Sequence, residues 1–565
     1  MTEIVLCADG RLQAGAGHLQ RCAALARALT TADSATRVAM IVLGPSGQLP
    51  LAVPDAVEIR PQFLDVVLQR PETVAAPDAL LVLDCYVLLQ EDWVSRLRAA
   101  CPTMPVLAFD DSGTGDGWPV LGTIRAGLAA PSRGLDRASG WFGASGSEYI
   151  PVRPDVASLV PVGGEAESQD ETSILIALGA ADPEQYAERI ALSLAALEFG
   201  GRVIVAHGSL ADPARAGVKP PDSRFTLLHA PGDFSSLMLS ASLGVTGLGN
   251  TCHELLNLGV PVAAVAVTPE QVASGIAMER LQCGTYLGRI ELLNNDDIGG
   301  SIMACLHNPG EMRRRAAIGR DIVDGRGAAR LANHIREAAE LYFEDRFRID
   351  EVADEFDRSA AETPEEHGKV RWGSMASMRN RIMLARERID WAGVGSWLDV
   401  GVGTGRSLVE VEEVAEISRF VGVDLSSEML TFAAGRPYRT RNVTFLRQNF
   451  AVPVRGEPFS LVTALGVLQQ CGLSLEFAIA RLGALTEPGG QLFMTTKNAA
   501  WRQFDESGLV PDSGHHWFQP ERLRRACAWG NLHILEMGSF DPANEAVSAE
   551  LTEHHSVFVL ARKIA

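Results

Sequence analysis

The stretch GAGHLQRC, residues 15–22, combines residue types that can bind an anion and move a proton. His18 and Arg21 lie three residues apart, so both can project from one side of the first turn of a helix. A histidine can act as a base near neutral pH, and an arginine can hold a carboxylate or a phosphate. Gly15 and Gly17 would let a ligand come close to the backbone, where the N–H groups of a helix N-terminus attract anions. Taken alone, the stretch is also compatible with a glycine turn that serves packing only.

A second glycine-rich turn, LDVGVGTG, places Gly401, Gly403 and Gly405 after an apolar run and before a helical pattern. The next apolar run ends in Asp424. Such a turn lets a ligand lie against the backbone, and an acid at the end of the following strand can accept hydrogen bonds from both hydroxyls of a ribose. The pattern predicts a nucleoside site, and by itself it also describes dinucleotide-binding domains.

The elements that must hold these turns are short apolar runs alternating with helical patterns, which is typical of βαβ units around a mostly parallel sheet. One cycle starts at EIVLCAD, a second at SILIALG and a third at SWLDV. The segment at residues 342–370 is acidic and poor in core aliphatics, as expected of a linker or exposed connector. We predict an α/β protein with domains at residues 1–155, 156–341 and 371–565, joined by this acidic linker.

Composition excludes several classes of function. The chain has 565 residues and a net charge of −20, which disfavours a general affinity for nucleic acid or anionic membranes. We find no apolar run near the roughly 20 residues that a membrane span needs and no signal-peptide pattern, so we expect a cytoplasmic protein. The nine cysteines include no CxxC pair, and no metal site is predicted. The oligomeric state stays open.

Several motifs of the first two predicted domains carry a resemblance. CADGRLQAGAGHLQRCAALARAL resembles the N-terminal signature of the nucleotide-sugar hydrolases of pseudaminic acid synthesis, which act on UDP-2,4-diacetamido-2,4,6-trideoxy-β-L-altropyranose. Further motifs of that family have counterparts in the same order, namely LLVLDCY, VLAFDD, EYIPVRPD, IALGAADP and GVTGLGNTCHELLNLGVPVAAVAV. The family is similar to GT-B glycosyltransferases, in which two Rossmann-like domains face a cleft and the second holds most of the nucleotide.

The resemblance implies roles for individual residues. His18 matches the histidine proposed to activate the attacking water, with Asp9 nearby as a candidate orienter. Asn250 and Thr251 match positions that receive the diphosphate on backbone N–H groups, and Glu254 matches the acid that bonds the ribose hydroxyls. Further contacts to substrate or nucleotide are expected from Gly15, Gly17, Arg21, Tyr86, Gly179, Gly249 and Gln271.

Some positions depart from the family's pattern. Cys7 stands where the family has an arginine, and the turns at residues 179–183 and 248–251 and the pair at 270–271 are altered. These changes touch substrate or phosphate contacts, so two alternatives to hydrolysis stay open. One is glycosyl transfer to an acceptor hydroxyl, and the other is a non-catalytic scaffold that binds a sugar and delivers it to the third domain. Helix capping and a site role stay open for three acids that follow apolar runs, Asp84, Asp110 and Asp111.

The third predicted domain is similar to class I S-adenosylmethionine-dependent methyltransferases. LDVGVGTG, GVDLSSEML, FSLVTALGVLQQ and LTEPGGQLFMTT correspond to four of their motifs in order. By that resemblance Asp424 holds the ribose of the cofactor, and either Gln448 or Asn449 accepts a bond from the adenine. The methionine part of the cofactor is expected to be bordered by Asp399, Gly401, Gly403 and Gly405.

The segment SGHHWFQPERL follows the fifth strand, where such domains often wall the acceptor pocket. His516 is the candidate base for methyl transfer, narrowly preferred to His515, while a plain surface turn is an equal alternative. Together the two resemblances imply a bifunctional enzyme that releases UDP from a UDP-diacetamido-trideoxy sugar and methylates a sugar with S-adenosyl-L-methionine. Such an enzyme would serve the synthesis of a modified sugar of the pseudaminic or nonulosonic acid type for a surface glycan.

Overall fold

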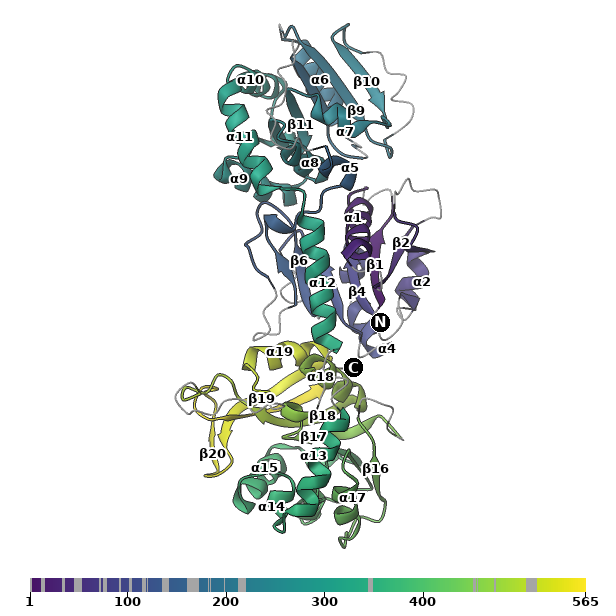
Figure 1. The fold of residues 1–565 in the computed structure, drawn as a ribbon, viewed down its shortest axis with the longest axis vertical. Helices are drawn as coiled ribbons and strands as arrows, with labels where there is room; N and C mark the ends of the chain where they lie inside the picture. Colours follow the sequence, from purple (N-terminus) through teal and green to yellow (C-terminus); the bar gives the residue numbers. More distant parts are fainter. Residues whose placement is uncertain are drawn as a thin grey trace.

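The computed structural model contains three α/β domains stacked along its longest axis (Figure 1). Two positions expected at the sites, Gly15 and His515, lie outside the residues that it describes. It describes residues 3–11, 16–32, 36–44, 53–70, 73–74, 79–90, 93–100, 104–113, 118, 120–134, 142–159, 172–180, 182, 184–197, 199–211, 220–343, 349–450, 454, 456–471, 474–504 and 516–564.

The first domain is built on a seven-stranded parallel sheet with the order β3-β2-β1-β4-β5-β6-β7. Its central strands are apolar along nearly their whole length, because helices and loops cover both faces of a parallel sheet. The strands are β1 (Glu3–Asp9), β2 (Arg37–Leu43), β3 (Glu58–Gln62), β4 (Leu80–Asp84), β5 (Val106–Phe109), β6 (Gly122–Arg125) and β7 (Ala144–Ser145). The main helices are α1 (Gly17–Ala32), α2 (Leu64–Gln69), α3 (Tyr86–Gln90) and α4 (Trp93–Ala100).

The second domain repeats this plan with a six-stranded parallel sheet of order β10-β9-β8-β11-β12-β13. The strands are β8 (Ser173–Ala177), β9 (Arg202–His207), β10 (Phe225–His229), β11 (Leu243–Gly247), β12 (Val262–Ala266) and β13 (Thr285–Arg289). The helices around it are α5 (Pro154–Ala157), α6 (Tyr186–Ala195), α7 (Phe234–Leu239), α8 (Asn250–Leu258), α9 (Val272–Leu281), α10 (Asn295–Leu306) and α11 (Pro309–Ile322).

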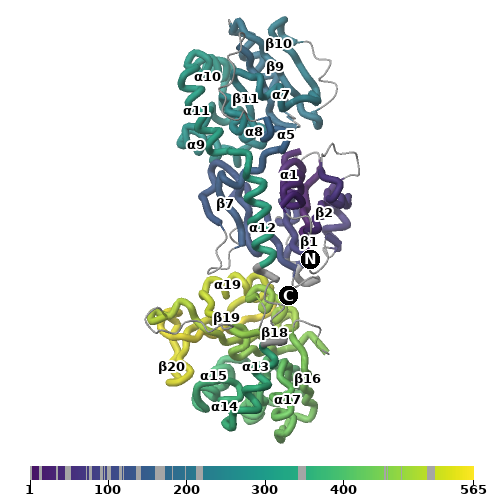
Figure 2. Tube along the Cα trace, in the orientation of Figure 1, coloured from purple at the N-terminus to yellow at the C-terminus, as the bar shows by residue number. Residues whose placement is uncertain are grey.

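Helix α12 (Gly327–Phe343) follows the second domain in the chain but packs against α1 of the first. Leu331 and Ile335 of α12 are fully buried in the same core cluster as Leu25 and Leu29 of α1. Figure 2 shows the chain leaving the upper domain, running along the middle domain as α12 and continuing into the lower one. Two Rossmann-like domains tied by a returning helix form the predicted GT-B-like pair.

The third domain carries an eight-stranded sheet with the order β16-β15-β14-β17-β18-β21-β19-β20. The first five strands in this order are parallel, and β21 inserts antiparallel between β18 and β19, which is the class I methyltransferase arrangement with one added edge strand. The strands are β14 (Ser396–Val400), β15 (Arg419–Asp424), β16 (Val443–Arg447), β17 (Phe459–Leu465), β18 (Thr486–Lys497), β19 (Leu532–Asp541), β20 (Ala546–Ser548) and β21 (Ser556–Lys563). The helices packed on it include α16 (Arg406–Val411), α17 (Ser427–Ala434), α18 (Leu475–Leu485) and α19 (Pro520–Trp529).

The acidic segment predicted as a linker covers the third domain with helices α13 (Ile349–Glu362) and α14 (Glu366–Lys369), followed by α15 (Met375–Arg388). Asp357 of α13 accepts hydrogen bonds from the Ser426 hydroxyl at 2.6 Å and from the Glu428 N–H at 3.2 Å. Glu366 of α14 accepts one from the Thr404 hydroxyl at 2.8 Å and pairs with Arg436. These acids therefore hold helices α13–α15, here called the cover, on the third domain instead of lying on a solvated connector. The domain boundaries given by the sequence stay a prediction.

Within the described ranges, no helix is both long and apolar enough to cross a membrane. The same residues contain no group of three or more histidine, cysteine, aspartate or glutamate side chains placed to hold a metal ion.

Candidate active sites

His18 lies in the first turn of α1, and its ring meets a buried carboxylate at the end of β4. The His18 Nδ1 atom is 2.5 Å from Asp84 Oδ1, and the His18 side chain is only 13% exposed. A carboxylate at Nδ1 favours the tautomer with the proton on that atom, which leaves Nε2 as the basic nitrogen. The pair can therefore act as an oriented general base.

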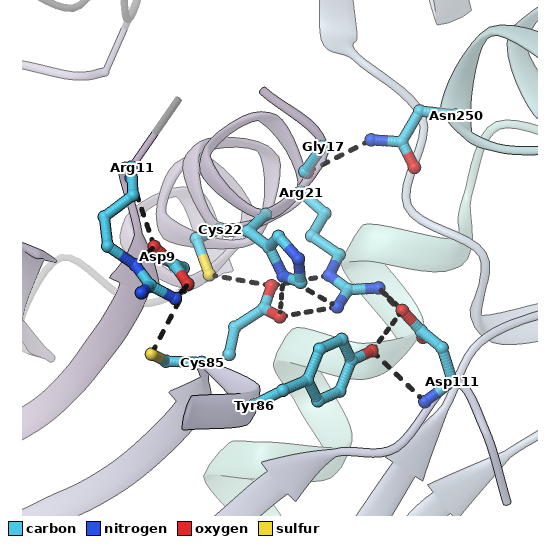
Figure 3. A network of polar contacts seen from close by, with 11 residues as sticks. Asp9, Arg11, Gly17, Arg21, Cys22, Cys85, Tyr86, Asp111 and Asn250 are labelled. Atoms are coloured by element: carbon cyan, nitrogen blue, oxygen red, sulfur yellow. Dashed lines mark hydrogen bonds and ion pairs between the residues drawn. The ribbon is translucent and has the colours of Figure 1, made fainter. Parts of the chain in front are cut away.

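Arg21 completes a buried network around Asp84. Its Nε and one Nη each donate to the Asp84 carboxylate at 2.5 Å, and its other Nη donates to Asp111 at 2.7 and 2.9 Å. The Tyr86 hydroxyl donates to the same Asp111 carboxylate at 2.5 Å, and Figure 3 shows Arg21, Tyr86 and Asp111 pointing toward one another. Arg21 and Tyr86 therefore organise the site through two acids, and the substrate contacts predicted for both residues stay a prediction.

Asp9, predicted as an orienter of the site, makes no hydrogen bond to His18 among the contacts of the described residues. Its carboxylate accepts two side-chain hydrogen bonds from Arg11, at 2.9 and 2.7 Å, and Figure 3 shows this pair apart from the Arg21 group. β1 and β4 are neighbours in the sheet, so both acids reach the same edge. Of these two acids, Asp84 is the one that contacts the first turn of α1, through His18.

The charge of Asp84 links this site to the stability of the first domain. Burial opposes ionisation, but the charge of Arg21 and the hydrogen bonds from Arg21 and His18 outweigh it and lower the Asp84 pKa from 3.8 to about 2. A carboxyl whose pKa falls on folding stabilises the fold above its unfolded pKa, and this stabilisation is lost as pH falls through the folded pKa.

We expect the first domain to lose about 2 kcal/mol of stability from this group between pH 5 and pH 2. Hydrogen exchange of the α1 amides at several pH values measures this loss. Asp84→Asn should be less stable at pH 5 but should show a shallower decline toward pH 2. An equally steep decline in the variant would contradict this account.

A cavity of about 1490 Å³, including space open to solvent, lies between the first two domains. The N-termini of α1 and α8 both border it, and Asn250 Nδ2 donates to the Gly17 carbonyl at 3.1 Å across the domain boundary. Gly249 precedes α8 without a side-chain cap, so backbone N–H groups of α8 are available to an anion. The cavity brings together most residues expected to contact the nucleotide: Gly17, Gly179, Gly249, Asn250, Thr251 and Gln271.

Two expected contacts differ in detail. Glu254 does not line the cavity, because it is buried and accepts two hydrogen bonds from Arg153, at 2.7 and 3.2 Å. Arg153 lines the cavity in its place, on the chain segment that crosses between the domains. Gln271 accepts a hydrogen bond from the Val267 N–H at 2.9 Å, so part of its amide is used to hold its own loop.

Three residues of the site were not singled out by the sequence: Asp84, for which capping and a site role stayed open, and Arg153 and His253, which had no predicted role. His253 of α8 couples electrostatically to Arg21 and Asp111 of the first domain, and burial lowers its pKa to about 4, so it is neutral at physiological pH. The position of Asp84 at the end of an apolar run, two residues before Tyr86, was the available signal for that acid. No local sequence pattern predicts that Arg153 and His253 lie at the site, because their positions there depend on how the two domains contact each other.

A second cavity, about 930 Å³ with its solvent-open part, lies at the carboxyl ends of the parallel strands in the third domain. The cover contributes Val352 and Phe356 from α13 and Met378 and Ile382 from α15. Most residues expected at the cofactor line this one cavity: Asp399, Gly401, Gly403, Asp424, Gln448 and Asn449.

Two acids set the polar end of this cavity. Asp424 accepts hydrogen bonds from the Gly403 N–H at 2.9 Å and the Ser426 N–H at 3.0 Å, and burial raises its pKa. Asp399 accepts one from the Thr463 hydroxyl at 2.6 Å, and burial raises its pKa to about 7 despite that bond. Asp424 thus retains acceptor capacity beside the glycine turn, whereas Asp399 ties β14 to β17.

Gly405 and His516 lie outside the lining of this cavity. Gly405 adopts a φ of +73°, and a Cβ on it would lie 2.1 Å from the Tyr438 hydroxyl oxygen, so packing requires glycine there. The His516 N–H donates to the Gln469 carbonyl at 2.8 Å, next to Gln470 in the cavity wall, and its ring stacks on Phe518.

The side chains that line this cavity fit a nucleoside. Apolar side chains such as Phe356, Phe450 and Val467 can pack on a base, side-chain amides can bond to its edge, and Asp424 can accept from ribose hydroxyls.

Residues 398–490 match the family model described as a methyltransferase domain. The match begins in β14 and ends in β18, and it includes the glycine turn and Asp424. The third domain is thus a methyltransferase domain in both sequence and strand order. No curated protein matches the chain at a significant level.

Similar solved structures include two glycosyltransferases and a methyltransferase. The calicheamicin glycosyltransferase CalG4 is similar over 60% of this chain and 98% of its own, with 17% identity and a TM-score of 0.39. The glycosyltransferase of kitacinnamycin covers the same shares, 60% and 98%, with 16% identity and a TM-score of 0.42. The N-methyltransferase NodS from Bradyrhizobium japonicum WM9, in complex with S-adenosyl-L-homocysteine, covers 38% of this chain and 98% of its own, with 15% identity and a TM-score of 0.29.

Proposed function

We propose that the first two domains hydrolyse a nucleotide sugar and that the third domain methylates a sugar with S-adenosyl-L-methionine. The observation that carries the first half is the His18–Asp84 pair at the N-terminus of α1, beside a cavity that α8 also opens onto. Release of a nucleoside diphosphate requires a base and an anion-binding group, and here the base follows Gly17, which lines the cavity beside the N-terminus of α8.

In this reaction a water molecule gives a proton to His18 Nε2 while its oxygen forms a bond to the anomeric carbon. The bond from that carbon to the diphosphate oxygen breaks, and its electron pair leaves with the nucleoside diphosphate. Backbone N–H groups at the start of α8 receive the developing negative charge. The ionised Asp84 stabilises the imidazolium that forms on His18.

We favour water over a sugar hydroxyl as the nucleophile because the base is enclosed. Only 13% of the His18 side chain is exposed, and the Asn250–Gly17 contact joins the two domains one residue away. A water molecule reaches such a nitrogen more readily than a bulky acceptor. The substrate that we propose is a UDP-diacetamido-trideoxy sugar, in keeping with the pseudaminic acid hydrolases that the N-terminal motifs resemble.

In the third domain, Asp424 would hold the ribose of S-adenosyl-L-methionine and Gln448 or Asn449 its adenine, with the glycine turn beside the methionine part. When bound, this cofactor supplies a methyl group on a sulfonium, ready for in-line transfer. The protein then has to align an acceptor hydroxyl and remove its proton, for which His516 is the candidate.

Product analysis tests both halves in the full-length protein. UDP-linked sugars, including the diacetamido-trideoxy sugar, are incubated with and without S-adenosyl-L-methionine and with and without sugar acceptors. The products are identified by mass spectrometry. Free sugar and UDP without an acceptor would support hydrolysis. UDP release that requires an acceptor would mean glycosyl transfer. Absence of nucleotide binding would mean that the first two domains are a non-catalytic scaffold.

A further inference from the structure

Two cations lie beside the methyltransferase cavity, outside its lining. Arg381 sits on α15 between Met378 and Ile382, which both line the cavity. Lys497 ends β18, two residues after Thr495, whose carbonyl accepts a hydrogen bond from the N–H of the cavity residue Gly466. Both cations thus lie where a methyl acceptor would approach, because ligands of such sheets bind at the carboxyl ends of the strands.

Within the ranges that the structure describes, neither cation has a carboxylate within ion-pair distance. Arg381 is 7% exposed, and its side-chain hydrogen bonds go to Ser377, at 2.8 Å to the hydroxyl and 3.3 Å to the carbonyl. Lys497 is half-buried. Among the residues that the structure describes, no acid lies within 4.0 Å of its amine, and the amine donates no hydrogen bond. A buried charge without a partner is costly and calls for an explanation.

Further basic groups surround the pair. Two histidines, His554 and His555, precede β21, and His555 couples electrostatically to Lys497 and Arg381. Burial and the charge of Arg381 lower the pKa of Lys497 to about 8, so the cations repel one another. Among the described residues, the acid coupled to Arg381 and His555 is Asp541, whose carboxylate accepts hydrogen bonds from the Ala543 N–H at 2.9 Å and the Asn544 amide at 2.7 Å.

Aromatic rings flank both cations. The Arg381 guanidinium lies 5.1 Å from the centroid of the Trp372 ring, which itself lines the cavity. The Lys497 amine lies 5.2 Å from the centroid of the Trp517 ring. Flat aromatic faces suit the apolar faces of sugar rings, whereas the cations suit an anionic group on the same molecule.

We propose that Arg381 and Lys497 bind a carboxylate or phosphate on the methyl acceptor, which makes the acceptor of the third domain an anionic sugar. An anion placed there relieves the repulsion between the cations and provides the partner that both lack. The proposal rests on the methyltransferase half of the proposed function, and it is independent of how the first two domains use their nucleotide sugar.

Binding of matched probes to the full-length protein tests the proposal by calorimetry. The probes are glucose, glucuronic acid and glucose 6-phosphate, each titrated with and without bound S-adenosyl-L-homocysteine. We expect at least one anion to bind and glucose not to bind, and the stronger anion distinguishes carboxylate from phosphate. Lys497→Gln should weaken anion binding about 10- to 100-fold, as expected for loss of a hydrogen-bonded charge.

Controls separate this site from the cofactor site. Lys497→Arg should restore anion binding, and Arg502→Gln, which removes an exposed arginine paired with Glu550, should leave it unchanged. All three variants should bind S-adenosyl-L-homocysteine as the wild type does; failure of the wild type to bind it would count against the proposed function alone. Equal binding of glucose and the anions, absence of anion binding, or anion binding that Lys497→Gln leaves intact would overturn the inference.

Discussion

His18→Ala is expected to slow UDP release from the nucleotide sugar by about 10²- to 10⁴-fold, the range typical for loss of a general base. The effect should fall on kcat, because His18 does not line the cavity proposed to hold the nucleotide. Steady-state assay of released UDP, together with calorimetric titration of UDP, measures both quantities. Unchanged UDP release would rule out His18 as the base.

A matched pair of variants separates the two acids that could orient His18. Asp84→Asn should lower kcat by about 10²-fold or more, since an amide cannot hold the same tautomer or stabilise an imidazolium. Asp9→Asn makes the same chemical change at the neighbouring strand end but affects only the contacts with Arg11 and Cys85, so we expect less than about a tenfold effect. Equal losses in the two variants would mean that the observed pairing does not serve catalysis.

Asp424→Ala is expected to weaken binding of S-adenosyl-L-homocysteine about 100-fold or more. The variant removes the proposed acceptor for ribose hydroxyls and also the carboxylate that holds the Gly403 N–H, and hydrogen bonds to charged groups contribute about 1.5–3 kcal/mol each. Calorimetry with S-adenosyl-L-homocysteine measures the loss.

Asp390→Asn is the control for Asp424→Ala, because Asp390 only caps a short turn before β14. It should bind S-adenosyl-L-homocysteine normally. UDP release should be unaffected in both variants, since the two cavities share no residue. Wild-type affinity in Asp424→Ala would show that the nucleoside lies elsewhere.

The cover over the methyltransferase cavity shows why charge patterns in a sequence are ambiguous. Residues 342–370 have the composition of a solvated connector, yet Asp357 and Glu366 bond to the turns around Ser426 and Thr404. A charged side chain that faces water and one that bonds to a neighbouring turn look alike in a sequence. The difference depends on where the segment packs.

By itself, the sequence determined the features that depend on neighbouring residues. Apolar runs and helical patterns predicted three α/β units. The glycine turns placed Gly17 at the start of a helix and Gly401 and Asp424 at strand ends, where the structure has them. These predictions succeed because a strand, its turn and the next helix are consecutive in the chain, and the carboxyl end of a parallel strand is a binding edge whatever its neighbours are.

Only the tertiary structure decided which groups meet. Asp84, 66 residues further along the chain, contacts His18. Glu254 accepts a hydrogen bond from Arg153, and Asn250 donates one to Gly17 across two domains. These contacts follow from the order of strands in the sheet and from the way in which the domains close. Two acids that each end a strand at the same edge of a sheet cannot be told apart from their local sequence. Only their distance from α1 in the folded protein shows which of them can contact His18.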